Sequence, residues 1–232
     1  PLSSANSISL GRLLPQMSYY AHAALGWWRE HGTPLGFIVP TGNLGNALAC
    51  LWVRELGLPI GEVRLACNAN ATLPEFFAGA DYRPREAVAT VANAMDVGAP
   101  SNFERLRWTF PDEAQLRQTL RAESVDDDTI RATALNHARE HGEVVCPHTA
   151  TAFALLDREA AHREHPWAVV ATAHPAKFET VLEPLLGHGL AVPTALALML
   201  ERSASAEALV AYDAALKQWL REHADACTAV PF

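Results

Sequence analysis

The residues best suited to chemistry form a glycine-rich turn at positions 42–46 (Gly-Asn-Leu-Gly-Asn), directly after a short apolar run. Gly42 and Gly45 carry no side chain, so the backbone amides of the turn are expected to approach a ligand closely. A helix is expected to follow, with its free N–H groups and positive dipole end at the same place. The pattern predicts either a phosphate-binding turn or a tight turn that only packs a helix on a strand.

Two further polar clusters are candidate ligand sites. Residues 4–12 place small polar side chains and Arg12 just ahead of a predicted helix, where they either cap the helix or bind an anion. Thr172 follows a third apolar run, and ligands of open α/β sheets gather beyond the carboxyl ends of strands. That threonine is either a hydrogen-bonding partner for a ligand or an ordinary polar strand end.

The remaining reactive side chains point to no further site. No spacing of His, Cys, Asp and Glu predicts a metal centre. His148 is interpreted either as a pocket residue or as a structural histidine, and Asp96 has no assigned role. The cysteines are far apart in apolar surroundings, which favours reduced core thiols in a cytosolic protein; they are Cys50, Cys67, Cys146 and Cys227.

The elements that must position these residues alternate between helix and strand. Apolar spacing predicts a helix over about 10–31, then a buried strand over 36–39 and, after the glycine turn, a helix ending near Leu56. Further strands are predicted at 63–67 and 167–171. A strand, a helix and a second strand in succession indicate the crossover of a parallel α/β sheet.

The rest of the chain is expected to be mainly helical. Residues from about 72 to 142 have a mostly helical pattern, and the acidic run 126–128 is typical of a helix N-terminus. Residues 205–222 predict an amphipathic helix near the end of the chain. With no internal repeat or linker, we expect a single domain over residues 1–232, with a helical insertion at about 72–142.

Composition narrows the classes of function. The 232 residues are 50% hydrophobic and 19% charged, which is enough apolar material for a folded core. The formal net charge of -8 disfavours nucleic acid as a partner, although a local pocket can still attract a small anion. No apolar run reaches the roughly 20 residues needed to span a bilayer, and no signal peptide is recognised, so a cytoplasmic protein is expected.

Several stretches together resemble the threonine synthase family. They occur in the family's order over nearly the whole chain, and the Asn-Ala-Met-Asp segment separates this family from cysteine synthases and serine/threonine dehydratases. The matching stretches are 4–8, 40–46, 93–102, 146–150 and 171–178.

The resemblance implies a helix-rich, three-layer αβα domain with a parallel sheet, of the tryptophan synthase β-like class (PLP fold type II). The cofactor would be pyridoxal 5′-phosphate (PLP), with its phosphate on backbone amides of the turn and its pyridine nitrogen on Thr172. The implied cofactor-binding residues are Gly42, Asn43, Leu44, Gly45, Asn46 and Thr172, and the implied substrate-binding residues are Asn6, Ser7 and Arg12.

The family's reaction makes the expected enzyme a carbon–oxygen lyase acting on phosphates. It converts O-phospho-L-homoserine and water to L-threonine and phosphate, as a step of threonine biosynthesis. Two alternatives stay open. One is a phospho-lyase of the same family that forms a 2-oxo acid, and the other is a non-catalytic truncated relative that binds a small anion.

The family's Schiff-base lysine precedes the glycine turn in sequence, and no lysine of this chain does so. Its two lysines are Lys177 and Lys217, and both follow the turn. We therefore assign no catalytic residue and expect a C-terminal portion that lacks the N-terminal domain and is inactive alone. Such a chain is expected either to expose a large apolar patch near the turn or to cover that patch by self-association.

Overall fold

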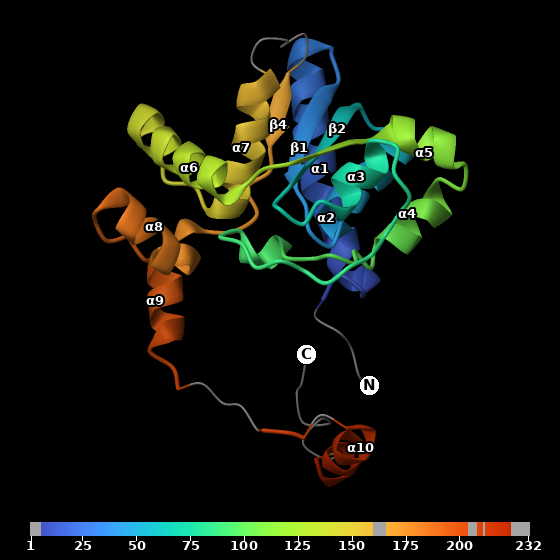
Figure 1. Ribbon diagram of the computed structural model, residues 1–232. Coiled ribbons are helices and arrows are strands. Elements are labelled where there is room, and N and C mark those ends of the chain that lie inside the picture. The colour runs from blue at the N-terminus through green and yellow to red at the C-terminus, as the bar shows by residue number, and fades with distance from the viewer. Residues whose placement is uncertain (1–5, 160–165, 204–207, 211, 224–232) are drawn as a thin grey trace. The chain divides into compact units, whose positions relative to one another are not determined.

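The structure is a computed structural model that describes residues 6–159, 166–203, 208–210 and 212–223. Contacts between its segments divide the chain into two compact units, Pro1–Ala191 and Val192–Phe232. The first unit contains the whole sheet and most of the helices, and the second contains α9 (Thr194–Leu200) and α10 (Asp213–Glu222) (Figure 1).

The first unit is built on a parallel sheet of four strands in the order β3-β2-β1-β4. The strands are β1 (Leu35–Pro40), β2 (Ile60–Cys67), β3 (Arg121–Ser124) and β4 (Trp167–Val169). The predicted α/β fold with a parallel sheet is therefore confirmed. The strand β3 was not predicted from the sequence, since its residues Arg-Ala-Glu-Ser form no apolar run.

Side chains of the central strands alternate between two cores, which gives the domain its three layers. Phe37 and Val39 of β1 pack into one core with α1 (Leu10–His31) and α2 (Gly45–Glu55). Ile38, between them in sequence, packs into the other core with α6 (Asp127–His141) and α7 (Pro147–Glu159). Burial of each such side chain contributes about 1.5–3 kcal/mol to folding.

The predicted helix boundaries agree with the structure where local signals are strong. The first helix matches α1, which ends at Gly32 in the left-handed conformation with φ 68°. The acidic run does start α6, because the Asp126 carboxylate accepts a hydrogen bond from the Thr129 N–H at 2.8 Å. That hydrogen bond lowers the pKa of Asp126.

Two helical expectations differ from the structure. The segment at 72–142 has helices, but β3 and a long irregular stretch interrupt them. The last helix begins at Asp213 instead of 205, and residues 208–210 are not helical, while 205–207 and 211 lie outside the described residues. The other short elements are α3 (Thr72–Phe77), η1 (Asn93–Met95), α4 (Phe103–Thr109), α5 (Glu113–Thr119), η3 (Pro175–Phe178) and α8 (Glu179–Leu186).

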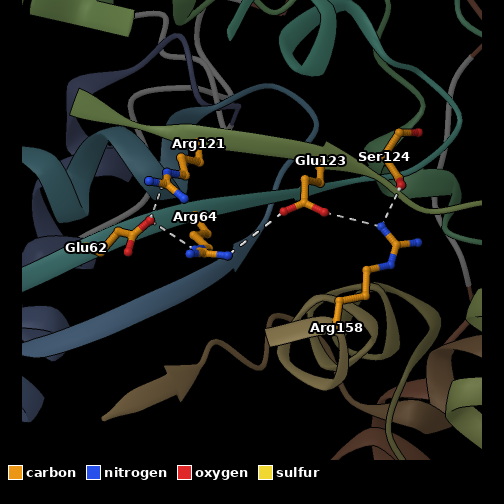
Figure 2. A network of polar contacts seen from close by, with 6 residues as sticks. All are labelled: Glu62, Arg64, Arg121, Glu123, Ser124 and Arg158. Atoms are coloured by element: carbon orange, nitrogen blue, oxygen red, sulfur yellow. Dashed lines mark hydrogen bonds and ion pairs between the residues drawn. The ribbon is translucent and has the colours of Figure 1, made fainter. Parts of the chain in front are cut away.

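Ion pairs fasten the polar edge strand β3 to its neighbours (Figure 2). Arg64 of β2 is buried, with its Nε 3.0 Å from a Glu62 carboxylate oxygen and its Nη1 4.0 Å from Glu123 of β3. Arg121 approaches Glu62 at 3.4 Å, and Arg158 of α7 approaches Glu123 at 3.4 Å. Alternating charges thus link β2, β3 and α7.

The cysteines of the described residues, Cys50, Cys67 and Cys146, are buried free thiols, as expected. Burial raises the pKa of Cys67 to about 12, so this thiol stays protonated at neutral pH. Cys227 lies outside the described residues. Within the described part of the chain, no helix has the length and apolarity needed to cross a membrane.

Candidate functional site

A cavity of about 960 Å³ opens at the carboxyl ends of β1 and β4, where the sheet topology places ligand sites. Its walls are the segment at 6–7, one face of α1, the glycine turn, η1, the start of α7 and the chain that follows β4. Arg12 and Lys177 bring positive charge, and no Asp or Glu is among the described residues that line it. The cavity therefore opposes the negative charge of the chain as a whole.

All the site residues predicted from the sequence line this cavity. They come from segments that are far apart in the chain but meet at this edge of the sheet. The set consists of Asn6, Ser7, Arg12, Gly42, Asn43, Leu44, Gly45, Asn46 and Thr172.

The glycine turn presents unpaired backbone donors to the cavity. Leu44 takes the left-handed conformation, with φ 65°, and caps α2. The first hydrogen bond of that helix runs from the Leu48 N–H to the Leu44 carbonyl, at 3.0 Å. The N–H groups of residues 42–46 have no acceptor among the described residues. Free N–H groups at a helix start beside a cavity suit a phosphate group.

The two glycines are needed for contacts behind the turn. A Cβ on Gly42 would lie 2.7 Å from the Met95 Cα, and one on Gly45 would lie 3.0 Å from the Ser7 Cβ. The turn therefore packs backbone to backbone on η1 and against the segment that precedes α1. These glycines serve protein packing, whereas the sequence analysis attributed their small size to ligand approach.

Asparagine side chains tie the turn to its neighbours. The Asn43 side chain donates to the Ser7 Oγ at 2.7 Å and accepts from the Ser101 N–H at 2.6 Å. The buried Asn102 donates to the Asn43 carbonyl at 3.0 Å and to the Ser7 Oγ at 3.1 Å. Because the Ser7 oxygen already accepts two hydrogen bonds, its own O–H is left to donate elsewhere.

Arg105 of α4 holds the segment at 7–8 from outside the cavity. Its Nη1 donates to the Ser7 carbonyl at 2.8 Å and to the Asn102 Oδ1 at 2.6 Å, and its Nη2 donates to the Ile8 carbonyl. This arginine was not predicted from the sequence as a site residue. Nothing in the sequence distinguishes it from Arg107 on the same short helix.

One face of α1 forms a wall of which only Arg12 was predicted from the sequence. Arg12, Gln16, Tyr19 and Tyr20 follow helical spacing and line the cavity. Tyr20 Oη donates to the Asn46 Oδ1, and the Asn46 Nδ2 donates to the Tyr19 Oη at 2.5 Å. The side chain of Asn46 is thus held by α1, while its backbone N–H has no acceptor among the described residues. The signal was available as polar residues recurring at helical spacing within an apolar stripe.

The chain after β4 supplies the opposite wall. The Thr172 side chain is exposed to the cavity, and its hydroxyl has no partner among the described residues. Lys177 of η3 also lines the cavity. Lys217 belongs to α10 in the second unit, where it pairs with Asp213 at 2.5 Å.

His148 is both buried and a lining residue of the cavity. It is 3% exposed, and its Nε2 accepts a hydrogen bond from the Ala94 N–H at 3.1 Å. Burial lowers the pKa of this imidazole to about 4, and the nearby Asp96 carboxylate offsets only part of that effect. The ring is therefore neutral at physiological pH.

Asp96 lies behind the cavity wall and organises the loop there. Its carboxylate accepts hydrogen bonds from the Asn68 side chain at 2.7 Å, the Thr90 N–H at 3.0 Å and the Thr90 hydroxyl at 2.7 Å. Asn70 donates to it at 3.3 Å. The acid that had no assigned role is a half-buried anchor for the residues around η1. The described residues contain no cluster of three or more metal-ligating side chains.

Comparison with known proteins gives one consistent answer. The family described as pyridoxal-phosphate dependent enzyme matches residues 15–175. The threonine synthase of Serratia marcescens is 36% identical over 219 residues, which are 94% of this chain and 51% of that protein. The chain therefore spans about half the length of the curated relatives it matches.

Solved structures of threonine synthases share this fold. The Escherichia coli threonine synthase matches 96% of this chain and 51% of its own, with a TM-score of 0.83 and 36% identity. A PLP-bound threonine synthase from Brucella melitensis matches 96% of this chain and 53% of its own, with a TM-score of 0.83 and 29% identity.

Proposed function

This chain belongs to the pyridoxal-phosphate dependent enzyme family, and from that premise we propose that it forms the cofactor- and substrate-binding part of a threonine synthase. The observation that carries the proposal is the row of unpaired N–H groups at 42–46, which faces a cavity lined by positive charge. These donors fit the phosphate of PLP, and the fit requires no side-chain charge in the turn.

The ring of PLP would lie toward the chain that follows β4. The free hydroxyl of Thr172 is a neutral partner for the pyridine nitrogen. When bound, PLP supplies an electron sink for carbanion chemistry at the substrate. The residues of this chain hold the phosphate, orient the ring and border the space in which the substrate lies.

The substrate we propose is O-phospho-L-homoserine, whose own phosphate needs a second set of donors. Arg12 offers a planar guanidinium that chelates phosphate, and Ser7 offers an O–H whose oxygen is already occupied as an acceptor. Asn6 lines the cavity on the same side. The overall reaction releases phosphate from the γ carbon and adds water at the β carbon, giving L-threonine.

We do not assign the cofactor-carrying lysine to Lys177, although it lines the cavity. It lies on the wall of Thr172, the residue to which we assign the pyridine nitrogen, and it follows the turn in sequence. Lys217 belongs to the second unit and is paired with Asp213. This chain alone is therefore expected to bind PLP without turning over the substrate.

The test is product analysis with O-phospho-L-homoserine and PLP. The chain is assayed alone and fused behind the first half of the Escherichia coli threonine synthase, with that half alone as control. We expect the fusion to release phosphate and threonine in equal amounts, and neither half to do so. Phosphate with a 2-oxo acid would instead indicate the phospho-lyase alternative, and no PLP-dependent product from a folded fusion would contradict the proposal.

We also propose a cytoplasmic location and self-association. The buried free thiols support a reducing compartment. Ile8, Leu10 and Leu14 support a contact surface, because they are 58%, 50% and 54% exposed beside the cavity segment at 6–7.

A further inference from the structure

The glycine turn depends on η1 for its position. Ala94 and Met95 of η1 line the cavity, and the missing Cβ of Gly42 would come within 2.7 Å of the Met95 Cα. Backbone packed on backbone has no flexible side chain to absorb a displacement. Any shift of η1 is therefore transmitted directly to the N–H groups that face the cavity.

Two contacts hold η1 in place, one on each side. Behind it, Asp96 gathers the donors of Asn68 and Thr90. On the cavity side, the Ala94 N–H donates to the Nε2 of His148 at 3.1 Å. The second contact comes from a different element, α7, which packs on β1, β2 and β4 of the sheet.

His148 is itself held rigidly. It is the second residue of α7, its ring meets the edge of Phe178 with centroids 4.7 Å apart, and its Nδ1 lies 3.8 Å from the Cys146 Sγ. The charged groups that act on the ring are Asp96 and Lys177. A buried ring with fixed contacts can hold η1, which it contacts through Ala94, in a constant position.

The hydrogen bond from the Ala94 N–H determines which nitrogen of the His148 ring carries the proton. Nε2 accepts from an N–H only when it carries no proton, so the remaining proton lies on Nδ1. The Ala92 carbonyl also lies near the ring, but it already accepts from the Met95 N–H at 2.9 Å and from Asn68 at 3.3 Å, so we assign the proton to Nδ1. The accepting nitrogen is also fully used, which leaves it no lone pair for a ligand.

We propose that His148 is a positioning residue: its neutral imidazole, protonated on Nδ1, holds η1 against the glycine turn and so sets the affinity of the cavity for a phosphate group. The inference rests on the proposed function only in the choice of PLP as the phosphate ligand. It assigns His148 no contact with substrate or cofactor.

Binding of PLP to three variants of this chain is the first test. Glutamine at 148 places an amide oxygen near the position of Nε2 and keeps the acceptor, whereas leucine removes it. We expect His148→Gln to keep PLP affinity within about threefold of the unmutated chain and His148→Leu to weaken it by about tenfold or more. The exposed His141→Gln, at the end of α6, is the matched control and should change nothing.

Equal losses in His148→Gln and His148→Leu, or no loss in His148→Leu, would overturn the inference. Near-UV circular dichroism checks that the variants keep their packing. If His148→Leu does not fold, the nitrogen NMR of the unmutated chain described next still decides the question, because it needs no variant.

The second test needs no ligand and separates this inference from the proposed function. Nitrogen NMR of the unmutated chain at pH 7 should show a neutral His148 protonated on Nδ1. The Ala94 amide should exchange with solvent at least about tenfold faster in His148→Leu than in His148→Gln. A proton on Nε2, or equal exchange in the two variants, contradicts the positioning role. Failure of the unmutated chain to bind PLP would instead contradict the proposed function alone.

Discussion

At the residue scale, the most constrained position of the site is Gly42. Its φ is not in the left-handed region, so the requirement for glycine is one of space and not of backbone conformation. The Met95 Cα occupies the place where a methyl group would lie, at 2.7 Å. A single added carbon must therefore move either the turn or η1.

Gly42→Ala should both destabilise the fold and weaken the binding of PLP in the cavity. We expect a loss of about 1–3 kcal/mol in the free energy of unfolding, as for other overpacked sites, and a fall in PLP affinity. Urea titration and PLP titration measure the two effects. Gly26→Ala is the matched control, because Gly26 lies within α1 with no atom near the added carbon.

The control should raise stability by about 0.5–1 kcal/mol, since alanine favours a helix interior more than glycine. It should leave PLP binding unchanged. If Gly42→Ala behaves like Gly26→Ala in both measurements, the close contact with η1 does not constrain the turn.

His148 should make stability depend on pH. Its pKa is lowered from 6.5 to about 4 in the folded state, mainly by burial. Above pH 6.5 the ring is neutral in both states, and its full contribution to stability is present. As the pH falls toward about 4, His148 binds a proton in the unfolded chain but stays neutral in the folded chain, so the free energy of unfolding declines.

The expected loss over that range is on the order of 3 kcal/mol, and His148→Gln should lack it. Urea unfolding of both proteins between pH 7 and pH 4 provides the comparison, because all other titrating groups are common to the two. Parallel curves would show that His148 does not titrate in this range upon unfolding.

At the element scale, α4 acts as a clamp on the segment that leads into α1. Arg105 binds the carbonyls of Ser7 and Ile8 and the side chain of Asn102. The Ser9 N–H donates to the Asn6 carbonyl at 3.1 Å within the clamped segment. Order in this segment is thus supplied by a helix that is far away in sequence.

Arg105→Ala should lower stability by about 2 kcal/mol, because hydrogen bonds from a charged donor are lost. It should also speed solvent exchange of the Ser9 amide. Arg107→Ala is the comparison variant, since Arg107 lies exposed on the same helix without a hydrogen bond or ion pair to any described residue. Similar Ser9 exchange rates in the two variants would contradict the role of Arg105 in ordering this segment.

The elements that could be predicted are those whose signals are local. The apolar runs of β1, β2 and β4 and the apolar stripe of α1 need no knowledge of their partners. The strand β3 has no such run, and the ion pairs that join it to β2, Arg64–Glu123 and Arg121–Glu62, form only once the sheet exists. The helix expected at 205–222 begins later in the structure, at Asp213. An apolar pattern alone does not show at which residue a helix begins.

The same distinction, between local signals and contacts made over long sequence separations, holds for the residues of the site. The turn and Thr172 were accessible from sequence, because motifs and strand ends are contiguous. The roles of Tyr20, Arg105 and His148 were not, since each depends on a contact with a residue far along the chain: Asn46, Ser7 and Ala94. The sequence left His148 open between two roles, and the structure shows a buried ring that also lines the cavity.

At the scale of the whole molecule, the apolar start of α1 should mediate self-association. Leu10 and Leu14 lie one helical turn apart and are about half exposed, at 50% and 54%. Sedimentation velocity should show dimers or larger species, and Leu10→Glu with Leu14→Glu should shift them to monomers. Trp108→Glu changes another exposed apolar residue and should have no effect. A strictly monomeric unmutated chain would contradict this surface.

The central claim is that the turn at 42–46 is a phosphate site in a chain whose net charge is -8. The most direct measurement compares the dissociation constants of PLP and of pyridoxal, which lacks the phosphate, for this 232-residue chain. We predict that PLP binds at least about tenfold more tightly, because charge-assisted hydrogen bonds to the phosphate are present only in PLP, and that inorganic phosphate displaces it. Equal affinities for the two, or no competition by phosphate, would contradict the assignment of the turn.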